Sequence, residues 1–368
     1  MTIRVLEKCH QISLVSQSAA CEYAAKREVI RALVDSKMTG DPEVMLYIGH
    51  GSMELMYANH GYHVNFMANV FKYNNYELLA RIAVWVYRSY HAHGFSYAYF
   101  YSALLTWQCS VRANLNEMHA KEISAVYQWM IDNHELLIAD AESNACETFP
   151  ISELDDVNKA FVELLLQGDV HSCLGLTMNF VQSFDKIADF YSETLQPCLY
   201  EIGRRWENGV ISVAHEHMAV AIVVRIMTAC YLQCKKRKLI KGRAIITTSP
   251  NEFHEIGARM IADIMEIEGW DVDYIGANTP ISELMCLVRE KRPQILGIAA
   301  VMPFNLEEVE RIIHEVKGDC EMQKIKIMVG GLAFFHAPEL AIKMGADAYV
   351  KSLSDALATA EKWWKEHR

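Results

Sequence analysis

Apolar positions follow two different periods along this chain. Between residues 153 and 237 they recur every three or four positions, as at Ala219, Ile222 and Ile226, which places them on one helical face. Short polar breaks interrupt the region at Gly168-Asp169, Asp185-Lys186 and Asn208-Gly209. The pattern predicts four helices joined by short loops over residues 153–237, as in a small four-helix bundle.

Beyond Gly242 the apolar residues come in short, nearly continuous runs that alternate with amphipathic segments of helix length. These runs are Ala244–Thr247, Val272–Ile275, Ile295–Ala300, Ile325–Val329 and Ala348–Val350. Such strands are typical of a parallel sheet that helices cover on both faces. The alternation predicts a flavodoxin-like doubly wound domain over residues 240–368.

Residues 1–148 have a third pattern, with a single proline, Pro42, and helical periodicity. Aromatic residues are far denser between Tyr57 and Trp107 than the chain average of 10%. The polar segment from Glu142 to Pro150 predicts a linker. We therefore expect a multidomain α and α/β chain, with an all-helical domain ahead of the bundle and the sheet.

Charge and composition argue against several classes of protein. The formal net charge of −11 argues against a nucleic-acid-binding protein, which needs a basic face. A local basic cluster is better explained as a solvated linker; it consists of Lys235, Lys236, Arg237, Lys238 and Lys241. The N-terminus lacks the apolar core of a signal peptide, and no uninterrupted stretch of about 18 apolar residues occurs. We expect a soluble, cytoplasmic protein that binds neither nucleic acid nor membrane.

The ten cysteines are scattered along the chain without a CxxC pair. This spacing indicates neither a disulfide framework nor a thiolate zinc site. We therefore expect reduced thiols, most of them buried in the cores of the domains.

The main candidate site follows the first expected strand, in the segment Asn251-Glu252-Phe253-His254-Glu255-Ile256-Gly257. His254 is expected on a loop at the carboxyl end of a strand, where open α/β sheets bind ligands. The carboxylate of Glu252 can accept a hydrogen bond from one imidazole nitrogen and leave the other for a metal. A zinc-protease site is excluded, because the histidine it needs four residues later is Ala258.

Small residues follow the later strands, with Gly297, Ala299 and Ala300 at one strand end and Gly330-Gly331 at the next. An ordinary turn explains each glycine alone, but together they predict a slot between sheet and helices for a long, thin ligand tail. Gly257 permits close approach of a helix start to a bulky ligand.

These residues resemble the cobalamin-binding Rossmann domain of methionine synthases, mutases and light-sensing cobalamin regulators. Glu252, His254 and Gly257 match the D/E-x-H-x-x-G motif, and Gly330-Gly331 matches the glycine pair. The resemblance implies that His254 ligates cobalt in place of the benzimidazole of the cofactor, which inserts beside the sheet. Ala299 stands near the position where the family often has a serine, a departure that weakens one expected contact with the inserted base.

The expected helical bundle carries Trp206, then nine residues, then Glu216-His217. A core tryptophan near a surface Glu–His pair would explain them without a ligand, but the cobalamin domain downstream favours a site. The W-x(9)-E-H spacing resembles the four-helix cap of the adenosylcobalamin photoreceptors among light-responsive transcription regulators. The resemblance implies that Trp206, Val213, Glu216 and His217 surround the upper 5′-deoxyadenosyl group. Methyl-carrying corrinoid subunits share the two-domain plan but lack this spacing.

One position departs from that family. The transcription regulators have a histidine directly after the tryptophan, and it captures cobalt after photolysis, whereas this chain has Glu207. We therefore expect a different light state, with water as a candidate cobalt ligand. His215 and His217 lie nearby, but the sequence does not assign the role to either of them.

The N-terminal region replaces the helix-turn-helix domain of those regulators. The stretch from Ala83 to Phe95 resembles the N-terminal helical domain of photocobilins, a degenerate globin-like domain that holds a bilin beside the cobalamin. The resemblance implies biliverdin as a second chromophore.

A linear tetrapyrrole needs aromatic walls, cations for its propionates and hydrogen-bonding groups for its pyrrole nitrogens. The candidate bilin-binding residues are His60, His63, Arg81, Arg88 and Tyr90. A tyrosine-rich helical core with satisfied histidines explains each of them equally well. Haem is the competing ligand, with His63 or His91 as its axial ligand. For Cys109 we expect a buried structural thiol in preference to a covalent bilin tether.

These features predict a light sensor of the photocobilin type and not an enzyme. Light would cleave the cobalt–carbon bond of adenosylcobalamin, and the cap would repack. The chain ends soon after the helix that closes the sheet, so we expect no fused catalytic domain. Output is then expected through light-dependent self-association or an unknown protein effector. The alternatives are a corrinoid methyl carrier of a methyltransferase system, and a haem- or redox-sensing regulator that uses cobalamin structurally.

Overall fold

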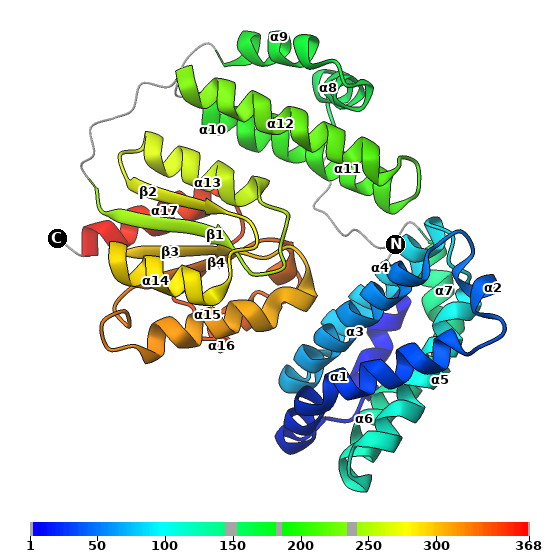
Figure 1. The fold of residues 1–368 in the computed structure, drawn as a ribbon. Coiled ribbons are helices and arrows are strands. Elements are labelled where there is room, and N and C mark those ends of the chain that lie inside the picture. Colours follow the sequence, from blue (N-terminus) through cyan, green and yellow to red (C-terminus); the bar gives the residue numbers. More distant parts are fainter. Residues whose placement is uncertain (1–2, 144–152, 182–185, 234–240, 367–368) are drawn as a thin grey trace. The chain divides into compact units, whose positions relative to one another are not determined.

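The computed structural model describes residues 3–143, 153–181, 186–233 and 241–366. The chain forms two compact units: Met1–Thr148 with Glu207–Val210, and Phe149–Trp206 with Ile211–Arg368. The described part of the first unit is helical, whereas the second combines helices with a sheet (Figure 1).

Several helices of the first unit begin at polar residues whose side chains cap them. Its elements are η1 (Arg4–Gln11), α1 (Gln17–Thr39), α2 (Val44–Ile48), α3 (Met53–Tyr73), α4 (Tyr76–Ala92), α5 (Tyr97–Asn114), α6 (Glu117–Asp132) and α7 (His134–Glu142). The side chains of Ser16, Ser52, Asn75 and Asn116 each accept a hydrogen bond from the backbone N–H three residues later. Each cap satisfies an otherwise unpaired N–H in the first turn, so these residues determine where α1, α3, α4 and α6 start.

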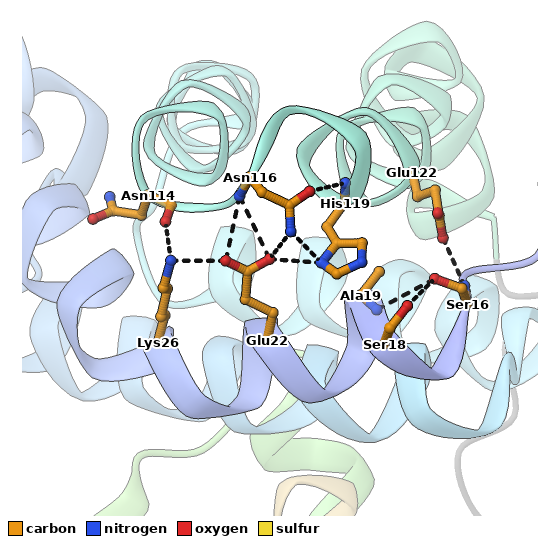
Figure 2. Close-up of polar contacts among 9 residues, drawn as sticks. All are labelled: Ser16, Ser18, Ala19, Glu22, Lys26, Asn114, Asn116, His119 and Glu122. Carbon is orange, nitrogen blue, oxygen red and sulfur yellow. Dashed lines mark hydrogen bonds and ion pairs between the residues drawn. The ribbon is translucent and has the colours of Figure 1, made fainter.

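A polar cluster joins α1 to the corner between α5 and α6 (Figure 2). The Glu22 carboxylate accepts hydrogen bonds from Lys26 Nζ at 2.7 Å and from Asn116 Nδ2 at 2.5 Å, and it lies 2.6 Å from His119 Nδ1. The hydrogen bond from Lys26, followed by that of His119, lowers the pKa of Glu22 to about 2. The cluster fixes the start of α6 against α1.

The second unit begins with the predicted four-helix region, which we call the cap. Its elements are α8 (Asp156–Gln167), α9 (Val170–Phe180), α10 (Ile187–Phe190), the π-helical turn η3 (Tyr191–Leu195), α11 (Gln196–Glu207) and α12 (Val213–Gln233). Because α10, η3 and α11 follow one another without a break, they act as one long helix. Gly168 at φ 76° ends α8 in a left-handed conformation that favours glycine.

A five-stranded parallel sheet follows, in the order β2-β1-β3-β4-β5. Its strands are β1 (Arg243–Thr248), β2 (Asp271–Gly276), β3 (Ile295–Ala299), β4 (Lys326–Gly330) and β5 (Ala348–Val350). The connecting helices are α13 (Ile256–Ile267), α14 (Ile281–Lys291), α15 (Leu306–Gly318), α16 (Glu339–Lys343) and α17 (Leu353–Glu366), with short 3₁₀ turns η4 (Pro303–Asn305) and η5 (Leu332–Phe334). In Figure 1, α13 and α17 cover one face, and α14, α15 and α16 cover the other. This strand order confirms the predicted flavodoxin-like doubly wound domain.

The cap packs on the sheet domain through α13. Ile256, Met260 and Ile264 of α13 belong to the same apolar core as the buried cap residues. Polar contacts flank this core, where Tyr191 Oη donates to Asp263 at 2.9 Å and Arg259 donates to Thr228 Oγ1 at 2.7 Å. The cap and the sheet domain therefore share one core.

The predicted strands agree with the structure to within one residue at each end. Among the described cysteines the predicted burial holds only in part: Cys173, Cys198 and Cys230 are buried and Cys9 is half-buried, whereas Cys21, Cys109, Cys286 and Cys320 are exposed. The expectation of a buried Cys109 fails because α5 presents this position on its solvent face, opposite the face that packs against α1 and α6.

Two sequence features reach beyond the described residues. The predicted linker after Glu142 falls mostly on residues 144–152, outside the described part, as do Lys235, Lys236, Arg237 and Lys238 of the basic cluster. Lys241 is described, and its Nζ lies 2.9 Å from the Glu361 carboxylate. It therefore takes part in the packing of α17.

Among the described residues, one helix, α12, is long and apolar enough to cross a membrane. Its buried side chains, including Ala219, Val223 and Ile226, belong to the core of the cap. Packing inside the cap thus accounts for its apolar face, because a core helix has the same composition as a membrane span.

Candidate functional site

The loop after β1 carries His254 to the carboxyl edge of the sheet. Thr248 Oγ1 donates to the Glu252 carbonyl at 3.0 Å, and the Ser249 N–H donates to the Ala299 carbonyl at 2.9 Å. Asn251 adopts φ 59°, a left-handed conformation that asparagine tolerates and that turns the loop. The His254 side chain is 55% exposed, so the loop is fixed while its imidazole faces outward.

Glu252 is the buried anchor of this imidazole. One carboxylate oxygen accepts a hydrogen bond from His254 Nδ1 at 2.5 Å, the bond that the sequence predicts. The other oxygen accepts from the N–H groups of Val301 and Met302 at 2.8 and 2.9 Å, and from Asn305 Nδ2 at 3.1 Å. With Nδ1 engaged by a carboxylate, Nε2 is the nitrogen left for a metal, and the carboxylate increases its basicity.

The charges of this pair are coupled. Burial opposes ionisation of Glu252, but the hydrogen bonds from His254 and from the Met302 and Val301 amides outweigh it and hold the pKa of Glu252 below its usual range. Although the His254 side chain is partly exposed, the protein atoms around its ring disfavour the imidazolium; the hydrogen bond and the charge of Glu252 outweigh this desolvation, so the pKa of His254 is raised. Glu216 of the cap adds to that rise through its charge.

A cavity of about 560 Å³ opens beside His254, between the sheet and the cap. The strand ends supply small lining residues, namely Gly297, Ala299, Gly330 and Gly331, and α13 supplies Gly257. The cap contributes Tyr191, Gln196 and Tyr200. The glycine-lined slot predicted from the sequence is therefore present as a cavity.

Two glycines of the cavity, Gly331 and Gly257, differ in what a side chain at their position would meet. A Cβ on Gly331, which has φ 102°, would lie 2.1 Å from the Ala300 carbonyl oxygen, so a side chain there is excluded. A Cβ on Gly257 would meet no atom within 4 Å. Gly257 is thus not needed for folding, and its missing side chain leaves space for a ligand beside His254.

The cap residues predicted to surround an upper ligand lie at the facing ends of α11 and α12. We call Trp206, Val213, Glu216 and His217 the roof. Val213 is 51% exposed, and the Glu216 carboxylate is hydrogen-bonded to His217 Nδ1. Glu216 lies close enough to His254 to act on its pKa, whereas the roof residues are not among those that line the cavity. The charge of Glu216 thus acts on His254, whereas the cavity beside His254 is lined by residues other than those of the roof.

Several residues of the site were missed from the sequence. The Val301 and Met302 amides carry no side-chain pattern, and Asn305 lies on the 3₁₀ turn after β3, more than fifty residues from Glu252. Tyr191 and Tyr200 of the cap resemble ordinary core aromatics until the cap packs over the slot. Tertiary folding alone brings these groups to the site.

The proposed bilin residues lie in the first unit among packed rings. His60 is 2% exposed, with Asp35 Oδ1 2.6 Å from its Nδ1 and the Tyr99 hydroxyl 3.1 Å from its Nε2. His63 Nε2 lies 3.2 Å from the Tyr127 hydroxyl, and burial, with the nearby His60, lowers the pKa of His63 to about 3. Both histidines are therefore integrated into the helical core.

The remaining bilin candidates lie on α4. Arg81 pairs with Glu77 at 2.8 Å, and Arg88 Nε donates to the Ala141 carbonyl at 3.2 Å. Tyr90 packs against Phe95 with ring centroids 5.5 Å apart, and burial raises its pKa. Both arginines thus have protein partners in the structure as it stands.

The chemistry of the C-terminal site fits a corrinoid. Within the described residues, no group of three or more histidine, cysteine or acidic side chains could hold a metal ion. A metal at His254 Nε2 must therefore bring most of its own ligands, as cobalt in a corrin ring does. The adjoining cavity, kept open by glycines, accommodates a tail of that cofactor.

Comparison with known proteins agrees with this geometry. Residues 242–360 match the model of a B12 binding domain, and residues 157–231 match the model of a second B12 binding domain. Dimethylamine corrinoid protein 1 of Methanosarcina mazei is 26% identical over 178 residues, covering 48% of this chain and 81% of the relative. The trimethylamine corrinoid protein of Methanosarcina barkeri is 27% identical over 161 residues, covering 43% and 73%.

A solved structure extends the agreement to the fold. The monomethylamine corrinoid protein of Methanosarcina barkeri superposes with a TM-score of 0.50 at 16% identity, covering 56% of this chain and 98% of that one. At this identity the likeness concerns the fold alone. Residues 1–156 lie outside both family matches.

Proposed function

We propose that this chain, a cobalamin-binding protein with two B12 binding domains, holds adenosylcobalamin and uses it to sense light. The observation that carries the proposal is the placement of Glu216, whose charge acts on His254 from the cap. Because Glu216 belongs to the W-x(9)-E-H residues, its effect on His254 supports the proposal that these residues cover the upper side of a bound cobalamin.

Each residue of the site would have a separate role in binding the cofactor. His254 holds cobalt through Nε2, and Glu252 keeps the imidazole in the required orientation. Trp206 and Val213 cover the upper group and exclude water, while Glu216 accepts hydrogen bonds from the hydroxyls of an adenosyl ribose. The bound cofactor supplies a cobalt–carbon bond that visible light cleaves. Once this group is lost, Trp206 would no longer contact it, and the cap helices would repack around Trp206.

The test is an absorption spectrum of the purified chain reconstituted with adenosylcobalamin, recorded in the dark and after green illumination, followed by size-exclusion chromatography. We expect a spectral change on illumination and a change in oligomeric state. A spectrum that stays the same under light would contradict light sensing. Glu216→Gln, with the exposed Glu283→Gln as matched control, is expected to alter the dark affinity for adenosylcobalamin but not for hydroxocobalamin.

A second candidate is favoured by the relatives, which are named as dimethylamine and trimethylamine corrinoid proteins. In that case the chain would carry a methyl group on the cobalt for a methyltransferase, and the upper face would have to open to a partner enzyme. Methylation of the reduced bound corrinoid by a methylated amine and its methyltransferase would support this role. A site that binds adenosylcobalamin much more tightly than methylcobalamin would count against it.

The role of the first unit is part of the same proposal. It would hold biliverdin among the rings near His60, His63 and Tyr90, with Arg88 or Arg81 exchanging its present partner for a propionate. Titration of the chain with biliverdin and, separately, with haem tests this. We expect a bound bilin spectrum, weakened by Arg88→Ala and unaffected by exposed Arg112→Ala. Haem binding in place of biliverdin would favour the haem-sensing alternative.

The output is proposed to be an association and not a reaction. A cytoplasmic sensor of this kind would signal through a second copy of the chain or through a protein effector. Light-dependent sedimentation of the holoprotein, alone and with cell extract, distinguishes these two routes.

A further inference from the structure

The sheet forms the floor of the cavity beside His254 with two rows of residues that run across neighbouring strands. Within each row the residues are register partners, and all six of them line the cavity: Ile246, Gly297 and Met328 in one row, and Ala299, Gly330 and Val350 in the other. Alternate residues of a strand point to the same face, so both rows belong to one face of the sheet. The second row lies nearer the carboxyl ends of the strands, and the first row lies deeper.

This floor is apolar, since none of the six side chains carries a nitrogen or an oxygen atom. In the deep row, a methyl group of Ile246 lies 2.6 Å from the point that a Cβ on Gly297 would take, so this methyl covers the glycine. In the other row, a Cβ on Gly330 would lie 2.9 Å from the Val350 carbonyl oxygen, which excludes a side chain there. Ala299 beside it ends in a methyl group. These side chains therefore offer an entering ligand no hydrogen-bond partner.

The polar side chains on the cap side of the cavity have partners within the protein. Gln196 Nε2 donates to the Tyr200 hydroxyl at 2.9 Å. The Tyr191 hydroxyl donates to Asp263 at 2.9 Å, and Ser192 Oγ donates to a backbone carbonyl of the preceding turn at 2.8 Å. A ligand group that needs a new hydrogen bond would have to compete with these existing ones.

Further polar lining residues follow the end of β5. Lys351 is exposed, and Ser352 accepts a hydrogen bond from the Asp355 N–H at 3.1 Å at the start of α17. The nucleotide tail of a corrinoid has a charged phosphate and a ribose, followed by a terminal base. A polar rim and an apolar floor match such a tail when the base enters first and reaches the floor.

We infer that this floor selects corrinoids by the base of their tail, with Ala299 as a specificity-determining residue. It favours a base with an apolar edge, such as dimethylbenzimidazole, over a purine. Adenine carries an amino group and several ring nitrogens, and burial of such groups without partners is unfavourable. Dimethylbenzimidazole presents two methyl groups and a single free ring nitrogen. The inference rests on the proposed function in one respect, namely that His254 holds a corrinoid whose tail enters the cavity.

The test is equilibrium titration of the full chain, followed by absorption, with three corrinoids in their hydroxo forms. These are cobalamin, the cobamide that carries adenine in place of dimethylbenzimidazole, and cobinamide, which has no tail base. We expect cobalamin to bind at least about tenfold more tightly than the adenine cobamide, because buried polar groups of the purine would lack partners. In the free cofactors cobalt holds the more basic benzimidazole more strongly, which acts against this order. Equal affinities for the two would overturn the inference.

A variant of the floor tests the role of Ala299. Ala299→Ser adds a hydroxyl that can pair with the amino group or a ring nitrogen of adenine, so the preference for cobalamin should fall several-fold. The matched control is Ala348→Ser, at another partly buried alanine on the same face of the sheet that is not among the residues lining the cavity. A preference that Ala299→Ser leaves unchanged, or that falls equally in Ala348→Ser, would contradict this role.

Cobinamide keeps the inference distinct from the proposed function. Cobinamide binding as tight as that of cobalamin would show that the cavity receives no tail, and would refute both the placement of the cofactor and the selectivity. Cobalamin binding that is tighter than that of cobinamide, but equal to that of the adenine cobamide, would refute the selectivity alone. A selective chain whose adenosylcobalamin spectrum does not respond to light would refute light sensing and leave the selectivity intact.

Discussion

The chemistry of the site depends on the Glu252 carboxylate, which hydrogen bonds hold in one orientation beside His254. Glu252 is enclosed by two backbone amides, the Asn305 amide and the His254 ring. The motif predicts the Glu252–His254 contact, because two residues on one turn are local. The donors from the loop after β3 could not be predicted, because their placement depends on the register of β1 against β3.

Replacement of Glu252 by glutamine tests this arrangement. The amide can turn only one oxygen toward its donors, so its NH₂ group faces either the imidazole or the Val301 and Met302 N–H groups. We expect affinity for hydroxocobalamin to fall by about 10- to 100-fold, the usual effect of losing a carboxylate behind a metal-bound histidine. Equilibrium titration of the absorption spectrum measures this. Exposed Glu283→Gln is the control, and equal affinities in both variants would refute the role of Glu252.

Gly257 provides a second test at the residue scale. A Cβ there meets no atom within 4 Å, and Gly257 lines the cavity, so we expect a leucine to be accommodated with its side chain in the cavity beside His254. We expect Gly257→Leu to leave the midpoint of thermal unfolding of the cobalamin-free chain nearly unchanged while it greatly weakens cobalamin binding. Gly318→Leu, at a glycine that is equally open but away from the cavity, should not affect binding. Unchanged binding by Gly257→Leu would show that the cavity does not receive the cofactor.

At the scale of elements, α13 links the cap to the sheet. Its apolar residues share the cap core, and Asp263 on the same helix accepts the Tyr191 hydroxyl. The amphipathic period of α13 could be predicted from the sequence, as could all five strands, because each is a local pattern. Which polar groups of α13 pair with the cap could not be predicted, since Tyr191 and Asp263 are 72 residues apart.

Burial of Asp263 where α13 meets the cap makes the stability of this packing dependent on pH. Burial raises the pKa of Asp263 to about 6, opposed by the Tyr191 hydrogen bond and the Arg259 charge and assisted by the Glu266 charge. The pKa of the folded state thus exceeds that of the unfolded state, so the contribution to stability is complete below about pH 4 and is lost as pH rises through 6. We expect this loss to reach at most about 3 kcal/mol by pH 7.5.

Urea unfolding of the wild-type chain and Asp263→Asn at pH 4.5 and 7.5 measures this effect. The asparagine variant should gain free energy of unfolding relative to the wild type as pH rises, because it carries no charge to bury. Asp156→Asn, at a fully exposed aspartate of the cap, should track the wild type at both pH values. A constant difference between Asp263→Asn and wild type would contradict the raised pKa.

At the scale of the whole molecule, the sequence predicts the cobalamin half better than the N-terminal half. A short motif such as Glu252-x-His254 specifies its own geometry, and family matches cover residues 157–231 and 242–360. The first unit offers aromatic density instead, and rings such as Tyr99 and Trp107 are packed in its core, which the density alone does not distinguish from a ligand site. Its chromophore therefore stays a prediction, while its helical fold is confirmed.

The first measurement to make is the absorption spectrum of the chain reconstituted with adenosylcobalamin, for wild type and His254→Ala, before and after green illumination. Wild type should show histidine-ligated cobalamin in the dark and a lasting change after light, whereas the variant should lack the histidine-ligated spectrum from the start. Identical dark spectra for the two proteins, or a wild-type spectrum that light leaves unchanged, would contradict the account.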